Sequence, residues 1–209
     1  MSFSKEQIDA LRESVRERMS EWRFTHTAEV EKMAVRLGEL YLPERLDILS
    51  AAALLHDITK EKSTDEHLTM LKTHGRTVTP IDEISPKTLH AKTAELLIGD
   101  EYAEFAAPEL ILAVRRHTTG SADMTLLDKI IYLADYIDES RKFEDCVKLR
   151  EYFWSAEVQK MSYEQRIEHL NRTLLLSFDM TLNALISEGA PISPDTIKAR
   201  NAIICALKK

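Results

Sequence analysis

Apolar residues recur along this chain at intervals of three and four positions, the spacing that gathers side chains on one face of an α-helix. This pattern predicts helices over 4–15, 23–37 and 43–55. The third of these is apolar nearly throughout, and it ends at the polar pair His56 and Asp57. The first half of the chain is therefore expected to be helical, with a polar pair at the end of a buried helix.

A shorter helix is expected after 43–55. Ser63 and Glu66 have the spacing of a capping box, in which each side chain bonds the backbone N–H of the other residue. Gly75 is a suitable stop for this helix, because glycine readily adopts the left-handed conformation that follows a helix end. The segment over 75–86 is expected to be a loop.

The second half of the chain continues the helical pattern. Thr125 has the position of an N-cap for a strongly apolar helix that carries Asp135. Further helices are expected over 90–98, 108–117, 174–186 and from Ser193-Pro194 onward. Alternating runs typical of β-strands are scarce, and only five Gly and six Pro interrupt the pattern. We therefore predict an all-α fold, with residues 1–209 forming a single domain.

Composition narrows the function classes. The chain is 44% hydrophobic and 30% charged, as in ordinary globular proteins, and its net charge of -7 argues against a nucleic-acid partner. We expect no membrane partner either, because no segment is apolar for long enough to span a bilayer. Cys146 and Cys205 lie far apart without metal-binding spacing, so a reducing cytoplasmic location is expected.

The candidate chemistry centres on four residues. Adjacent side chains leave a helix about 100° apart, so His56 and Asp57 can bind one ion only where the helix end points at it. An isolated buried carboxylate costs several kcal/mol, and Asp57 therefore needs a compensating cation or metal. His26 near the start of the second helix and Asp135 in the late apolar helix complete a candidate set of metal ligands.

Metal ligation is one of two roles that the sequence allows for Asp135 and for His26. A salt bridge to Lys60, Lys129 or Arg141 would also account for Asp135. His26, taken alone, is more typical of a surface or capping position than of a metal ligand. Imidazole and carboxylate together suit iron, manganese, cobalt, nickel or zinc, so the ligand types do not identify the ion.

Two further histidines sharpen the hypothesis. If His90 and His117 face the same site, Asp57 could bridge two ions, which would together activate a hydroxide and clamp a phosphoryl group. With one ion, the same histidines would contact phosphate oxygens, and a purely structural role would place each in a contact between helices. The remaining histidines are interpreted as surface residues: His67, His74 and His169.

Four segments in order, 23–27, 52–60, 117–120 and 128–137, resemble the YqeK-type HD-domain proteins. This resemblance implies an HD-domain helical bundle, with a metal core at about 23–150 and a C-terminal helical extension. That family is known as symmetrical bis(5'-nucleosyl)-tetraphosphatases, iron-dependent enzymes that split diadenosine tetraphosphate into two ADP. By the resemblance, His26, His56, Asp57 and Asp135 match the metal ligands.

The resemblance also implies roles beyond those four ligands. His90 and His117 match positions that face a metal or a nucleotide phosphate. One or two iron ions are implied as the cofactor, with manganese or another divalent metal as the alternative. Hydrolysis would proceed by a metal-activated hydroxide, without a covalent intermediate.

A tetraphosphate needs concentrated positive charge in a protein of net charge -7. Lys60 follows His56 by about one helical turn and is expected to act beside Asp57 in catalysis. The expected substrate-binding residues are Lys60, His90, His117, Thr118 and Arg141, with Arg23 and Lys129 as further candidates. For each cation, a solvated or ion-paired surface charge is the alternative. The run 174–185 is either the adenosine side of the site or, more simply, a packed helix.

Two other functions are compatible with the sequence, and the oligomeric state is open. A related HD hydrolase could act on a guanosine alarmone or a nucleoside monophosphate, and product identity would distinguish it. A non-catalytic nucleotide-binding module would bind without turnover. A homodimer is compatible with the apolar terminal helices.

Overall fold

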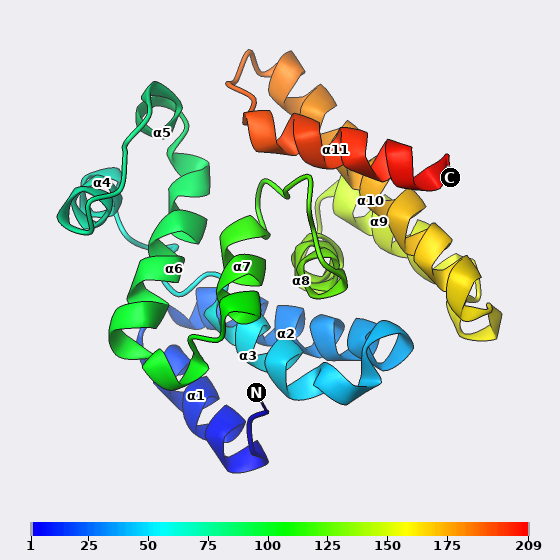
Figure 1. The fold of residues 1–209 in the computed structure, drawn as a ribbon, viewed down its shortest axis with the longest axis horizontal. Coiled ribbons are helices and arrows are strands. Elements are labelled where there is room, and N and C mark those ends of the chain that lie inside the picture. The colour runs from blue at the N-terminus through cyan, green and yellow to red at the C-terminus, as the bar shows by residue number, and fades with distance from the viewer. Residues whose placement is uncertain (1, 209) are drawn as a thin grey trace.

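The computed structural model describes residues 2–208, which contain α-helices and short 3₁₀ helices but no strand (Figure 1). The prediction of an all-α fold is therefore confirmed. The α-helices are α1 (Lys5–Glu17), α2 (Glu21–Tyr41), α3 (Leu46–Leu55), α4 (Thr64–Thr73), α5 (Pro80–Ile84), α6 (Leu89–Glu101), α7 (Pro108–Arg116), α8 (Leu126–Ile137), α9 (Glu144–Ser155), α10 (Tyr163–Ser187) and α11 (Pro194–Leu207). The 3₁₀ helices are η1 (Pro43–Arg45), η2 (Pro86–Thr88), η3 (Ala103–Phe105) and η4 (Val158–Lys160).

Two helix starts follow the caps predicted from the sequence. The capping box of Ser63 and Glu66 opens α4 as predicted, and a further capping box, of Ser4 and Gln7, opens α1. Thr125 caps α8 as expected, since its hydroxyl accepts a hydrogen bond from the backbone N–H three residues on. These local signals identify the helices because each satisfies N–H groups that a helix start otherwise leaves unpaired.

Three helices differ from the sequence-based prediction. The expected loop over 75–86 contains the short helix α5, whose capping box joins Thr79 to Asp82. The structure also forms α9, which no sequence pattern had indicated, and α10 begins at Tyr163 rather than near 174. The helix α5 begins at its local capping box, whereas α9 is stabilised by long-range packing, since Leu149 and Phe153 are fully buried.

The centre of the molecule is α3, which packs along α2 and also contacts α7 and α8 (Figure 1). Residues 48–55 of α3 are all buried, which is why this helix is apolar on every side. Its end, with His56 and Asp57, is therefore fixed inside the bundle.

The C-terminal helices α10 and α11 pack on each other and lie on the opposite side of the molecule from α4, and the turn between α10 and α11 faces α5 across a shared cavity (Figure 1). One continuous hydrophobic cluster runs from Phe3 to Ile203 and includes Phe178 of α10 and Ala199 of α11. The C-terminal helices share this cluster with the rest of the molecule. The division into a metal core at about 23–150 and a C-terminal extension therefore stays a prediction.

Two of the histidines interpreted as surface residues are buried, and that prediction is wrong for them. His67 contacts the hydroxyl of Thr93 at 2.8 Å, and His169 contacts the backbone carbonyl of Phe153 at 3.0 Å. Their partners come from other helices, so neighbouring sequence gives no sign of burial. His74 is exposed, as expected.

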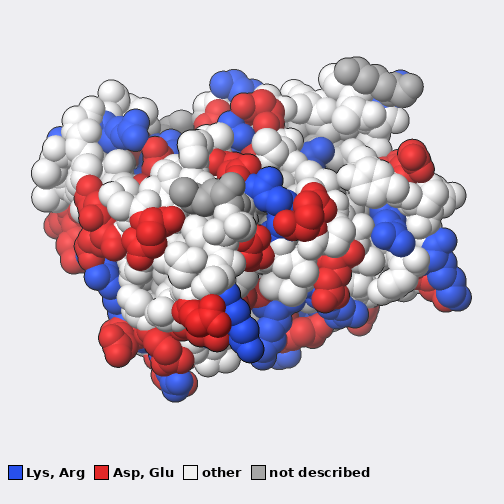
Figure 2. All heavy atoms as spheres, turned by 60° about the horizontal axis from the view of Figure 1, so that its bottom comes forward, with Lys and Arg blue, Asp and Glu red and all other residues white. Residues whose placement is uncertain are grey.

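Two observations bear on the expected partners: the distribution of charge on the surface and the length of the apolar helices. Acidic and basic side chains are interspersed on the face seen in Figure 2, where no broad basic area is visible. Over residues 2–208, none of the helices combines the length and the apolar character that crossing a membrane requires.

Candidate metal centre

Three helices deliver the four central residues to one buried point. His56 and Asp57 follow the last turn of α3, His26 projects from the first half of α2, and Asp135 lies near the end of α8. The His26 Nε2 atom lies 3.0 Å from Asp135 Oδ1 and 3.9 Å from Asp57 Oδ2, and His56 Nε2 lies 3.6 Å from Asp57 Oδ2. The candidate ligands predicted from sequence therefore converge in space.

The other oxygen of Asp57 faces a second pair of histidines. Its Oδ1 lies 3.1 Å from His90 Nε2 and 3.7 Å from His117 Nε2, and these two nitrogens are 3.0 Å apart. His90 comes from the first turn of α6, and His117 caps the end of α7. Asp57 thus stands between two groups of imidazoles, with one carboxylate oxygen directed at each.

Backbone contacts orient two of these rings. His56 Nδ1 lies 2.6 Å from the carbonyl oxygen of Ala53, and His117 Nδ1 lies 2.6 Å from that of Val114. Each ring therefore donates its Nδ1–H to its own helix and leaves the Nε2 lone pair directed at the cluster. Burial lowers the pKa of His56 to about 4, so this imidazole is neutral and able to act as a ligand.

His26 is held by Ser140 and Asp138, two residues that the sequence did not identify as part of the site. Its Nδ1 lies 3.2 Å from Ser140 Oγ and 3.4 Å from Asp138 Oδ2, and Asp138 is completely buried. Burial opposes the charged imidazole, but the carboxylates of Asp135 and Asp138 outweigh it and raise the pKa of His26 to about 9. The one available signal was the position of Asp138 directly after an apolar helix.

Both central carboxylates are ionised. Burial opposes the charge of Asp57, but the facing imidazoles of His56, His117 and His90 hold the pKa of its carboxyl well below the usual range. Burial likewise opposes the charge of Asp135, and the guanidinium of Arg141 lowers the pKa of that carboxyl. The centre therefore combines anionic oxygens with imidazole nitrogens, of which His26 would lose its proton to bind an ion, and this donor set suits divalent transition metals.

Unpaired atoms test whether a metal fits here. His56 Nε2 and Asp57 Oδ1 are buried and have no partner with hydrogen-bond geometry among the described residues, and His26 Nε2 faces the carboxylate of Asp135. Ligand atoms within each of several overlapping triads lie within 4.8 Å of one another, including those of His26, His56 and Asp57 and those of Asp57, His90 and His117. Because buried polar atoms are normally satisfied, a cation at this point would complete the site.

Cations surround the cluster. Arg23 Nη1 donates to Asp57 Oδ2 at 2.8 Å, and Lys60 Nζ lies 3.6 Å from Asp57 Oδ1 and 2.9 Å from His90 Nε2. Arg141 donates to the carboxylate of Asp135, which is the salt bridge considered from the sequence. Asp135 forms this salt bridge and also faces His26. A salt bridge and metal ligation, the two roles considered for Asp135, therefore do not exclude each other.

The structure does not bring every candidate to this place. Lys129 donates to Asn171 of α10 at 2.9 Å, so its predicted role in substrate binding stays a prediction without support from the geometry. Thr118 lines a cavity of about 420 Å³ together with Lys60, His117 and Asp135, and its buried hydroxyl has no partner among the described residues. Thr118 is therefore available to donate a hydrogen bond to a ligand in that cavity.

Comparison with known proteins agrees with this arrangement. Residues 23–140 match the model of the HD domain family. The chain is 29% identical over 194 residues to the symmetrical bis(5'-nucleosyl)-tetraphosphatase of Halalkalibacterium halodurans, covering 93% of this chain and 95% of that protein. It is 28% identical to the protein of the same name from Bacillus subtilis, covering 91% and 94%.

A solved structure is similar over the whole length. It is a Clostridium acetobutylicum protein described as a predicted HD superfamily hydrolase involved in NAD metabolism. The TM-score is 0.81 and the identity 28%, covering 99% of this chain and 100% of the other. The likeness therefore extends beyond the segment that carries the cluster.

Proposed function

Since the chain belongs to the HD domain family, we propose that it is a metal-dependent hydrolase that cleaves diadenosine tetraphosphate symmetrically into two ADP. The observation that carries this proposal is the position of Asp57, with one oxygen facing His26 and His56 and the other facing His90 and His117. Relatives with that activity in their names cover nearly the entire chain, and this supports the choice of substrate.

The donor set fits one or two divalent ions. His26, His56, Asp57 and Asp135 would hold the first, and a second would be held by Asp57 with His90 and His117. Such ions, when bound, lower the pKa of water and neutralise charge on phosphoryl oxygens. Iron is our preferred ion because the sequence resembles the iron-dependent YqeK-type proteins, and manganese is the alternative that metal analysis would detect.

The chain's own cations would bind the phosphates. Arg23 and Lys60 each contact Asp57 and carry further N–H donors, and the Nε of Arg23 is buried without a partner among the described residues. Arg141 contacts Asp135 and lines one cavity with Arg23 and another with Lys60. These three cations would hold the polyphosphate at the cluster, and the hydroxyl of Thr118 would donate to one of its oxygens.

Symmetric cleavage would follow from where the substrate is held. If one ADP half is bound by Lys60 and Thr118, the central anhydride bridge is presented at Asp57, and the other ADP leaves. Water is the nucleophile, so no covalent intermediate forms on the protein and each product carries a terminal phosphate. We keep a reducing cytoplasm as part of the proposal, in accord with the free thiols of Cys146 and Cys205. A homodimer stays a prediction for a solution mass measurement.

The test is to incubate anaerobically purified, iron-loaded protein with diadenosine tetraphosphate and to separate the nucleotides by chromatography. ADP as the sole product is the expected result. AMP with ATP would refute the symmetric cut, and unchanged substrate would refute the proposal. In that case guanosine alarmones and nucleoside monophosphates are the next substrates, and binding without turnover would indicate a regulatory module. The Asp57→Ala variant, handled identically, is the control for contaminating hydrolases.

A further inference from the structure

A cavity of about 630 Å³ opens beside the metal centre and reaches His26. Two aromatic side chains on its wall are strongly exposed, with 72% of Trp22 and 72% of Phe143 accessible to solvent. Trp22 lies in the first turn of α2, and Phe143 is the residue before α9, so the fold brings them to one cavity from distant parts of the chain. The metal centre makes no use of either ring.

Each aromatic residue lies close in the sequence to an arginine that contacts the metal centre, Arg23 for Trp22 and Arg141 for Phe143. The guanidinium carbon of Arg23 lies 4.7 Å from the centre of the Trp22 ring, while Nη1 of the same residue contacts Asp57. Phe143 and Arg141 line both this cavity and the 420 Å³ cavity that contains Lys60 and Thr118. A ligand whose phosphates contact these arginines would therefore place its other end against the aromatic rings.

Three polar side chains of the cavity wall, other than the arginines, already form hydrogen bonds within the protein. Thr25 donates its hydroxyl to the backbone carbonyl of Glu21, and Lys142 donates to that of Glu139. The hydroxyl of Ser140 is bonded to Asp138. The cavity thus offers ring faces and apolar surface, while the hydroxyls of Thr25 and Ser140 and one N–H of Lys142 are bonded within the protein.

From these observations we propose that the cavity binds the base of the nucleotide whose phosphates lie at the metal centre, by stacking on Trp22 and Phe143. This inference rests on the proposed function and names the part of the site that holds the nucleoside. Stacking accepts any base, because every base has a π face, whereas selection between bases requires hydrogen bonds to their edges. The site is therefore tolerant of the base, and dinucleoside tetraphosphates with adenine or guanine are both substrates.

The test compares a ligand that has a base with one that lacks it. Binding of ADP and of inorganic pyrophosphate to the manganese-loaded protein is measured by calorimetry for the Trp22→Ala and Phe143→Ala variants. Stacking of one base contributes enough affinity that each variant weakens ADP binding by about five-fold to more than one-hundred-fold. Pyrophosphate binding stays at the wild-type value in both variants.

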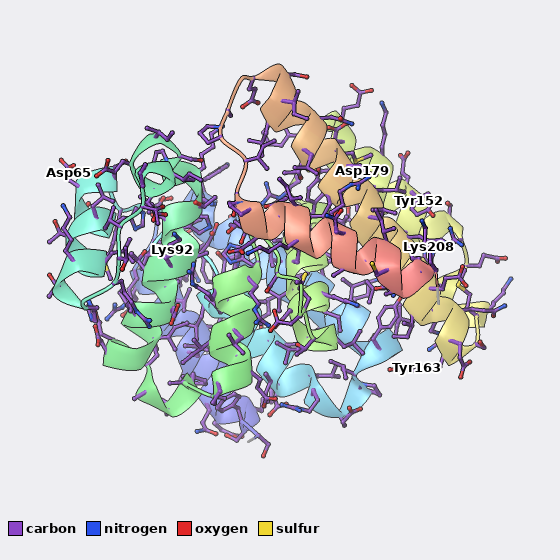
Figure 3. The ribbon with its side chains drawn as sticks, turned by 45° about the horizontal axis from the view of Figure 1, so that its top comes forward. Asp65, Lys92, Tyr152, Tyr163, Asp179 and Lys208 are labelled. Atoms are coloured by element: carbon purple, nitrogen blue, oxygen red, sulfur yellow. The ribbon has the colours of Figure 1, made fainter. Side chains whose placement is uncertain are left out.

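Tyr163→Ala is the matched control. This tyrosine is also an exposed aromatic residue, 52% accessible, but it lies in the first turn of α10 outside the cavity (Figure 3). Its removal leaves the binding of both ligands unchanged. Equal losses for ADP and pyrophosphate in the Trp22 and Phe143 variants, or no loss for either ligand, would overturn the proposal.

Fluorescence supplies a readout that does not depend on turnover. The chain has two tryptophans, so Trp154→Phe leaves Trp22 as the one indole fluorophore. ADP quenches its emission while pyrophosphate does not, provided that a melting curve shows this variant to be folded. Identical responses to the two ligands would contradict stacking on Trp22.

Failures of the two proposals are distinguishable. Base-dependent binding of ADP without hydrolysis of diadenosine tetraphosphate would refute the proposed function and leave the nucleoside site standing. Hydrolysis with a wild-type KM in the Trp22→Ala and Phe143→Ala variants would refute the nucleoside site alone. A preference of more than about one-hundred-fold between ADP and GDP would refute the base tolerance, since such discrimination is typical of edge recognition.

Discussion

Alanine in place of Gly120 is expected to destabilise the protein by two separate effects. Gly120 follows α7 with a φ of +68°, a conformation that L side chains rarely adopt. A Cβ at this position would lie 2.7 Å from Cζ of Phe178 and 2.9 Å from Cβ of Ala199. The substitution therefore adds a packing conflict to a backbone penalty, directly after the segment that carries His117 and Thr118.

The magnitude can be worked from the two effects. The left-handed conformation costs an alanine about 1–2 kcal/mol. Overpacking adds about 1–3 kcal/mol, because Phe178 is fully buried and Ala199 nearly so, and neither contact is the free end of a flexible chain. The free energy of unfolding should thus fall by about 2–5 kcal/mol.

Gly75→Ala is the matched control, because Gly75 has a φ of +65° and no heavy atom within 4 Å of the added Cβ. It should lose only the backbone part, about 1–2 kcal/mol. Urea denaturation of both variants in EDTA, followed by circular dichroism, gives the two free energies without the contribution of bound metal. Equal losses in the two variants would refute the packing of Gly120 against α10 and α11.

The remaining predictions concern the metal centre and one ion pair. Asp57→Ala should lower turnover by at least roughly 100-fold and reduce bound metal, measured by elemental analysis, because it removes the carboxylate shared by both imidazole groups. Lys60→Ala should lower kcat/KM by about 10- to 150-fold while metal content stays intact, as expected for one lost charge-assisted hydrogen bond. Asp138→Asn should weaken metal affinity by about 10- to 100-fold, and an unchanged Kd in a metal titration would contradict its orienting role. Burial opposes the charge of Asp82, but the hydrogen bond from Lys92 lowers its pKa. This ion pair therefore stabilises the fold above about pH 4, and the stabilisation is lost as the pH falls below that value. The melting temperature of Asp82→Asn, measured between pH 6 and 3, should therefore fall less with falling pH than that of the wild type.

The helical architecture is predictable from the sequence because caps and apolar faces are local signals. The hydroxyl of Ser4 and the carboxylate of Glu66 act within one turn, and the buried face of α3 is visible as an apolar run. The candidate ligands were also identifiable, because a carboxylate at Asp57 or Asp135 conflicts with the apolar residues around it. Whether these residues bind a metal stays a prediction.

The features that could not be predicted from the sequence depend on contacts between distant helices. Asp138 contacts His26 across more than one hundred residues of chain, and His169 bonds a carbonyl of α9. Trp22 and Phe143 look like ordinary surface residues until the fold places them on one cavity. No local pattern encodes such pairings, since either partner is compatible with many surroundings.

The three helices that end at the candidate metal centre also contribute through their direction. His56 caps the end of α3, His117 caps the end of α7, and Asp135 lies in the last turn of α8. The carboxyl end of a helix has a dipole charge equivalent to about half an electron, so three negative poles meet at the centre. These poles add to the carboxylates of Asp57 and Asp135 in attracting a cation, while Arg23, Lys60 and Arg141 supply the opposite charge at the same place. The direction of the helices thus contributes to affinity for a metal ion, and the binding of phosphate depends on the side-chain cations and on that ion.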